Sequence, residues 1–188
     1  MTVFWTSDWH LGHQKEFVWK ARGFPTMDQH DNYLIKHWQQ TVTKHDEVVM
    51  VGDMFMGQGK VQRAVDLFAS LPGRKTWVLG NHDPKPAALQ PVVDIGITVI
   101  PFGKSFEWGL QQSTFFLVNH LPYEGTPHAV HGPNDRDFLP YPEDRGFPLI
   151  HGHTHSKEFK SRGPANGLMF HVGVDAHAGL VAYEELIK

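Results

Sequence analysis

Short apolar runs and amphipathic stretches alternate through the first hundred residues. The runs "TVFWTSD" (2–8), "DEVVMVGD" (46–53) and "KTWVLGNHD" (75–83) are rich in β-branched and aromatic residues and end in polar ones, which is typical of buried strands. Between them, "VQRAVDLFASLPG" (61–73) predicts an amphipathic helix stopped by Pro72 and Gly73. An earlier helix over about 28–43 is predicted by apolar residues at helical spacing, and Thr26 and Gln29 resemble a capping box at its start. Two strand–helix–strand units with parallel crossovers, and so an α/β fold, follow from this order.

In the second half of the chain the spacing between apolar runs shortens. The segments that read as strands are "GITVIPF" (96–102), "SFEWG" (105–109), "STFFLVNH" (113–120), "FPLIHGH" (147–153) and "LMFHVGVD" (168–175). A last short helix is predicted in "VAYEELIK" (181–188). One long irregular segment, residues 121–147, is rich in proline, glycine and charges, and loops of that length are usually functional. We find no repeat or linker, so we expect residues 1–188 to form a single domain.

Composition narrows the classes of partner and ligand. A chain of 188 residues with a formal charge of −3 lacks the broad basic surface of non-specific nucleic-acid binding, so long duplex DNA is not an expected partner. No apolar run is long enough to span a membrane, and "MTVFWTSDWH" does not resemble a signal peptide, so we expect a cytoplasmic protein. Because cysteine is absent and 14 histidines are present, any metal must be held by His, Asp, Glu or Asn.

Polar side chains that can bind a metal or a phosphate follow several predicted strands. They are Asp8 and His10, then Asp53, then Asn81, His82 and Asp83, then His120, then His153 and His155. In open α/β folds the ligand site lies beyond the carboxyl ends of the strands, so we expect these groups to converge. Taken singly, each is more typical of a turn or a cap.

Taken in order, "DWH", "GD", "GNHD", "NH" and "GHTH" resemble the motifs of the calcineurin-like metallophosphoesterase superfamily. The resemblance covers residues 3 to about 175. The context "LPGRKTWVLGNHD", with "HVGVD" near the end, is similar to the small bacterial and phage phosphoesterases of that superfamily. It implies an α/β fold in which a two-sheet β-sandwich is flanked by helices, the metallophosphoesterase fold.

The same resemblance implies a dinuclear metal centre. One metal would be held by Asp8, His10, Asp53 and His155, and the other by Asp53, Asn81, His120 and His153. A carboxylate has two oxygens, so Asp53 can join two cations, and a hydroxide that bridges them would be the nucleophile. Two divalent transition-metal ions are expected; Mn is favoured, and Fe, Zn and Ni also suit ligands of this type.

Other roles are assigned around this centre. His82 would donate a proton to the leaving alkoxide, and Asp83 would fix its tautomer. The predicted substrate contacts are His13, Tyr123, Arg136 and Arg145, the last three within the irregular segment, while Trp9, Phe24 or Tyr123 could stack on a base. His151 is interpreted as a packed strand residue. Gly52, Gly80 and Gly152 precede predicted ligands and would allow close approach of the backbone.

These assignments predict a phosphodiesterase that acts on small phosphate esters, with a small or cyclic nucleotide as the first candidate substrate. A phosphomonoesterase or phosphoprotein phosphatase is the alternative within the enzyme class. A non-catalytic interaction module on the same fold is the alternative outside it, and the complete set of expected ligands argues against that reading.

Overall fold

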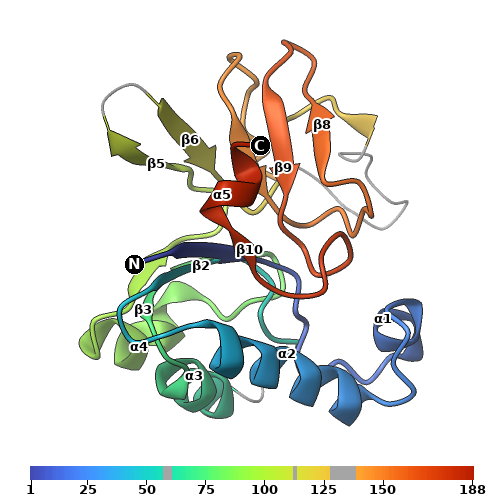
Figure 1. Cartoon of the computed structure of the whole chain (residues 1–188), viewed down its shortest axis with the longest axis vertical. Coiled ribbons are helices and arrows are strands. Elements are labelled where there is room, and N and C mark those ends of the chain that lie inside the picture. The colour runs from blue at the N-terminus through green and yellow to red at the C-terminus, as the bar shows by residue number, and fades with distance from the viewer. Residues whose placement is uncertain (57–60, 112–113, 128–138) are drawn as a thin grey trace.

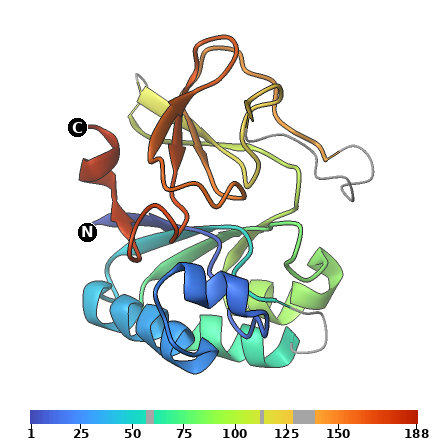
Figure 2. The same cartoon turned by 90° about the vertical axis from the view of Figure 1, so that its right-hand side faces the viewer.

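The strands of the protein form two sheets that stack face to face (Figure 1). The computed structural model describes residues 1–56, 61–111, 114–127 and 139–188. Within these residues each sheet has five strands. All helices except the short C-terminal one cover the outer face of the first sheet, and the C-terminal helix lies at the side of the sandwich (Figure 2). The predicted α/β fold with a two-sheet sandwich is therefore confirmed.

The first sheet is built by the strand–helix–strand units of the N-terminal half. Its order is β10 (Val181–Ala182), β1 (Val3–Thr6), β2 (Glu47–Val51), β3 (Arg74–Val78) and β4 (Thr98–Ile100). Strands β1 to β4 are parallel and β10 pairs antiparallel with β1. Parallel pairing brings the carboxyl ends of β1, β2 and β3 to one edge of the sheet, which is where the polar motifs begin.

The helices, except for the last one, connect the parallel strands. They are α1 (Glu16–Ala21), α2 (Met27–Thr41), α3 (Val61–Ser70), the 3-10 turn η2 (Pro86–Leu89), α4 (Gln90–Asp94) and, after β10, α5 (Tyr183–Leu186). Helix α2 matches the predicted one to within two residues at each end, and the Thr26 side chain caps it by accepting from Gln29 N at 3.2 Å. Helices α1 and α4 were not predicted, because five or six residues are too few to show helical periodicity.

The second sheet carries the remaining strands. Its order is β5 (Phe106–Gln111), β6 (Thr114–Val118), β7 (Leu149–His151), β9 (Leu168–His171) and β8 (Lys160–Arg162). Strands β6, β7 and β9 are parallel, so their carboxyl ends also share an edge. Strand β8 was not predicted, because "KSR" is a polar edge strand without an apolar run.

Two apolar layers hold these elements together. Val48 and Met50 of β2 belong to the cluster under the helices, with Trp38 and Phe68, whereas Val49 packs between the sheets. Successive side chains of a strand point to opposite faces, so β2 is buried on both. This explains its uninterrupted apolar sequence. None of the helices in the described residues has the length and apolar character that crossing a bilayer requires.

Candidate metal centre

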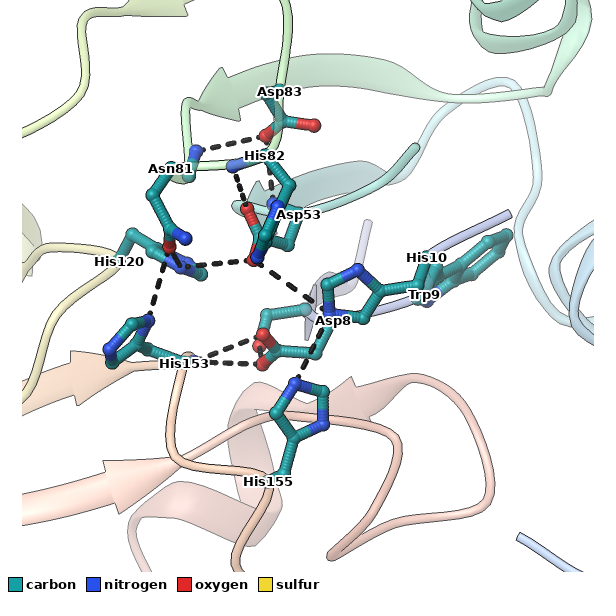
Figure 3. A network of polar contacts seen from close by, with 12 residues as sticks. Asp8, Trp9, His10, Asp53, Asn81, His82, Asp83, His120, His153 and His155 are labelled. Carbon is teal, nitrogen blue, oxygen red and sulfur yellow. Dashed lines mark hydrogen bonds and ion pairs between the residues drawn. The ribbon is translucent and has the colours of Figure 1, made fainter. Parts of the chain in front are cut away.

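The predicted ligands lie together at the carboxyl ends of five strands from both sheets (Figure 3). Asp8 and His10 follow β1, Asp53 follows β2, Asn81 follows β3, His120 follows β6, and His153 and His155 follow β7. The site is thus assembled across the sandwich, and neither sheet alone contains all of its side chains.

One half of the site is formed around His10 and His155. Their Nε2 atoms lie 3.2 Å apart, and His10 Nε2 lies 3.7 Å from Asp53 Oδ2. Asp8, His10 and His155 each offer a ligand atom, and these atoms all lie within 4.8 Å of one another. Two imidazole nitrogens and a carboxylate at this spacing form a donor set that fits a transition-metal ion.

The other half is formed around Asn81, His120 and His153. Asn81 Oδ1 lies 3.2 Å from both His120 Nε2 and His153 Nδ1. His120 Nε2 lies 3.5 Å from Asp53 Oδ2, the same oxygen that faces His10. Asp8, Asp53 and His120 form a second group whose ligand atoms lie within 4.8 Å. Asp53 therefore lies between the two halves.

The backbone at the site adopts an unusual conformation. Among the described residues, the non-glycine residues with positive φ are Asp8, His10, Asp53, His153, His155 and Asn166, with φ between 48° and 71°. Five of these six are predicted ligands. Side chains other than glycine rarely adopt this left-handed conformation, and its cost is about 1–3 kcal/mol per residue. Strain concentrated in this way is characteristic of functional sites.

Close packing of the loops explains the three glycines that precede predicted ligands. A Cβ on Gly52 would collide with the His120 ring, and a Cβ on Gly80 would collide with the Asp53 carboxylate. Gly52 also has a φ of 92°, which favours glycine. The prediction that glycines allow the backbone to approach the ligands is therefore confirmed. A Cβ on Gly152 would likewise collide with Ser7 and Asp8.

Two buried carboxyl groups of the site are held in their charged form. Burial raises the pKa of Asp53, but His120 outweighs this effect and the pKa falls to about 2. Burial lowers the pKa of His120, but Asp53 outweighs this effect and raises the pKa to about 9. The Asp8 carboxyl is also held in its charged form, with a pKa well below the ordinary value. A divalent cation would supply the positive charge that these buried carboxylates otherwise draw from imidazolium.

Two of the predicted histidine ligands are neutral near pH 7. Burial lowers the pKa of His10 and of His153 to about 4. Neutral imidazole is the form that binds metals. His151 is buried as well, with a pKa of about 3 that follows from burial, and its Nδ1 lies 2.8 Å from the carbonyl of Gly152. Its interpretation as a packed strand residue is confirmed.

Asp83 has a different role from the one predicted. Its carboxylate accepts from the backbone N–H groups of Asp53, Met54, Phe55 and Gly80, and from Trp77 Nε1, at 2.8–3.4 Å. Burial, followed by repulsion from Asp53, raises its pKa to about 7. Between the described residues no hydrogen bond joins it to the His82 side chain, and in Figure 3 its carboxylate points away from that ring. The predicted Asp83–His82 pair is therefore corrected: Asp83 holds the loop that carries Asp53.

The residues predicted to contact substrate differ in their burial and in their distance from the centre. His13 is buried, its Nδ1 accepts from Lys15 N at 3.0 Å, and its ring centroid lies 6.0 Å from that of His10. Arg145 is exposed and pairs with Glu143 at 2.8 Å. Arg136 lies outside the described residues. Tyr123 is fully buried and its hydroxyl donates to the Phe147 carbonyl, so the predicted contact of Tyr123 with substrate is wrong. Trp9 is likewise buried and cannot stack on a base.

Two residues in contact with the site were not predicted. Arg22 pairs with Asp175 through Nη2 and Oδ2 at 2.7 Å, and Asp175 Oδ2 also lies 2.7 Å from His155 Nδ1. Burial raises the pKa of Asp175, but hydrogen bonds from His155 and Arg22 outweigh it and lower the pKa to about 2. Arg22 belongs to no motif. The one sequence signal for Asp175 is its place at the end of "HVGVD".

Comparison with known proteins identifies the family of this chain. The sequence profile described as calcineurin-like phosphoesterase matches residues 1–157, which include every predicted ligand. The chain belongs to the calcineurin-like phosphoesterase family. It is similar to the Gene 66 proteins of two mycobacteriophages, with 33% identity for Mycobacterium phage L5 and 34% for phage D29. Each alignment covers 98% of this chain, and 91% and 93% of the respective relatives.

A solved structure shows the same fold. The protein of unknown function AQ665 from Aquifex aeolicus superposes with a TM-score of 0.64, over 99% of this chain and 97% of its own, at 18% identity. At this identity the likeness concerns the fold alone. The predicted resemblance to the calcineurin-like superfamily is confirmed by the family match, and the two relatives that align over most of their length are phage proteins.

Proposed function

We propose that this calcineurin-like phosphoesterase is a dinuclear-metal-dependent phosphodiesterase. Asp8, His10, Asp53 and His155 would hold one cation, and Asp53, Asn81, His120 and His153 the other. This proposal rests on the position of Asp53 Oδ2, which lies 3.7 Å from His10 Nε2 and 3.5 Å from His120 Nε2. When bound, two divalent cations supply an activated water nucleophile and bind the phosphoryl oxygens. Mn is the favoured metal, with Fe, Zn and Ni as alternatives.

His82 is placed to protonate the leaving group. Its side chain is exposed, while its backbone N–H donates to Asp53 Oδ1 at 2.9 Å and so fixes the residue beside the centre. Its ring centroid lies 5.5 Å from that of His10. A histidine at the rim of the site can reach a bound ester without serving as a ligand. General acids of this kind contribute about 10²–10⁴ in rate.

The charges near the site favour a diester over a monoester. A phosphomonoester dianion carries one more negative charge than a diester, and its binding in a partly buried site calls for a further cation. Within the described residues, Arg22 is the one Lys or Arg side chain that donates a hydrogen bond to a predicted ligand, namely to the Asp8 carbonyl at 2.8 Å. Because Arg22 is already paired with Asp175, it offers little charge to a dianion.

A cavity next to the site supports a nucleotide-type substrate. It has a volume of about 550 Å³ and shares Arg22 and Asp175 with the surroundings of His155. Phe24 and Tyr33, whose ring centroids lie 5.2 Å apart, also line it, and Lys157 stands at its edge with an exposed side chain. Aromatic faces and a free ammonium suit a nucleobase and an anionic group of the same ligand.

Hydrolysis of matched esters tests this function. The protein is treated with chelator, dialysed and reloaded with Mn, Fe, Zn or Ni, and its rates are measured on an aryl phosphodiester, the corresponding monoester and a cyclic nucleotide. We expect metal-dependent turnover with the diesters preferred. A preference for the monoester would support the phosphomonoesterase alternative. Absence of turnover with all esters and all four metals would support the non-catalytic alternative.

The variant His82→Ala tests the assignment of the general acid. We expect two bound metals, normal folding, a loss of about 10²–10⁴-fold on the nucleotide diester and a smaller loss on the aryl diester, since an aryloxide needs less protonation. His45→Ala, an exposed histidine before β2, is the matched control and should change neither rate. Equal losses on both esters, or loss of a metal, would contradict the general-acid role.

A further inference from the structure

His155 is held differently from the other predicted ligands. The side chains of His10 and His120 are 4% and 0% exposed, so packing restricts their rings, whereas the His155 side chain is 42% exposed. Packing alone therefore leaves the His155 ring free to turn. A ligand that must be oriented at an open edge of a site needs a hydrogen-bond partner to fix it.

Asp175 provides that partner. Its Oδ2 lies 2.7 Å from His155 Nδ1, which leaves His155 Nε2 facing His10 Nε2 at 3.2 Å. His153, two residues earlier, faces Asn81 through Nδ1 instead. The two histidines of "HGHTH" thus present different ring nitrogens to the centre. A carboxylate that accepts from Nδ1 selects the tautomer of His155 whose Nε2 can bind a metal.

Arg22 fixes Asp175 in turn. Its Nε and Nη2 donate to the two Asp175 oxygens at 2.9 and 2.7 Å, a bidentate pair in which the side chains are 5% and 13% exposed. Its Nη2 also donates to the Asp8 carbonyl at 2.8 Å, and its Nη1 to the Trp9 carbonyl at 3.3 Å. Arg22 therefore connects the loop after β1 to the loop after β9. The positive charge of Arg22 also offsets the negative charge of Asp175, so the pair adds no net charge beside the centre.

We propose that Asp175, held by Arg22, is a positioning residue that orients His155 and sets the metal affinity of the Asp8–His10–His155 half. The inference rests on the proposed function, because it needs a metal at that half. It assigns a role to two residues that lie outside the five motifs and are not themselves predicted ligands. It also predicts that a substitution of Asp175 changes the metal affinity of this half and leaves that of the other half nearly unchanged.

Metal affinity measured directly tests the proposal. Wild type, Asp175→Ala, Asp175→Asn, Arg22→Ala and the double variant Arg22→Ala/Asp175→Ala are titrated with Mn by equilibrium dialysis, with bound metal quantified by mass spectrometry. Asp144→Asn is the matched control, because Asp144 likewise accepts several hydrogen bonds, in its case from the backbone N–H groups of Gly146, Ala165 and Gly167 in a different loop. Urea unfolding establishes that each variant is folded.

We expect Asp175→Ala to raise the Kd of one Mn equivalent by about 10–100-fold and to leave the other nearly unchanged. Asp175→Asn should have a smaller effect, because its amide oxygen can still accept from His155. The double variant should lose less affinity than the sum of the two single losses, since Arg22 and Asp175 act as a pair. If Asp175→Ala fails to fold, the same pattern in Asp175→Asn and Arg22→Ala supports the proposal.

Three results would overturn it. They are wild-type affinity for both equivalents in a folded Asp175 variant, an equal loss of affinity in Asp144→Asn, and additive losses in the double variant. Failure of the proposed function is distinguishable, because wild type itself would then bind no Mn or hydrolyse no ester. Failure of the positioning role alone leaves wild type with two metals and full activity.

Discussion

Strand β2 is flanked by an aspartate at each end, and the surroundings of the two carboxylates differ. Asp46, just before the strand, accepts from Thr43 Oγ1 at 2.7 Å and from the backbone N–H groups of Thr2 and Thr43 at 2.7 and 2.9 Å. Asp53, two residues after the strand, accepts from His82 N and faces His10 and His120. Neutral donors satisfy the first carboxylate, whereas the second faces the imidazole nitrogens of two predicted metal ligands.

The backbone shows the same contrast. Asp53 has a φ of 52°, and the other predicted ligands with positive φ surround it, while Asp46 is not among the positive-φ residues. An unstrained turn satisfied by neutral hydrogen bonds serves the stability of the fold. Strain combined with converging ligand atoms points to a binding role. Substitution of each aspartate should therefore affect a different property.

The largest expected effect comes from Asp53→Asn. An amide removes the negative charge that both halves of the centre share, so both metals should bind more weakly and turnover should fall by about 10³-fold or more. Metal content after dialysis and the rate on an aryl diester provide the measurement. Asp46→Asn is the control and should keep both metals. Two fully bound metals in Asp53→Asn would show that Asp53 is not the bridge.

An intermediate effect is expected for Asp83→Asn, which weakens the support of the Asp53 loop. An amide group in place of one carboxylate oxygen would face backbone N–H donors and leave them unpaired, at a cost of about 1–3 kcal/mol in unfolding free energy. Urea unfolding measures this loss, and His82→Ala, at an exposed side chain, should show almost none. Wild-type stability in Asp83→Asn, with a loss of rate confined to alkyl esters as in His82→Ala, would instead restore the predicted Asp83–His82 pair.

The sequence predicts most of the fold and the location of the site because both depend on local patterns. Val48 to Val51 are apolar without interruption since both faces of β2 are buried, and the polar residues that follow lie at the strand's carboxyl end. The direction of the Asp83 carboxylate could not be predicted, because it depends on backbone groups of a loop 28–30 residues away. The Arg22–Asp175 pair could not be predicted either, because 153 residues separate its members and no motif contains Arg22.

The smallest effect is expected at Asp46, and it should depend on pH. Hydrogen bonds from Thr43 and Thr2 lower the pKa of Asp46 from its ordinary value of 3.8 to about 2. A carboxyl whose pKa is lower in the folded protein stabilises it above the unfolded-state value, and this contribution disappears as the pH falls through the folded-state value. Wild type should therefore exceed Asp46→Asn in stability at pH 7, and the difference should shrink between about pH 4 and pH 2. Urea unfolding at several pH values, with chelator present throughout to remove the contribution of metals, measures this difference. A difference that stays constant down to pH 2 would mean that the Asp46 charge contributes nothing and that the variant acts through the shape of the turn.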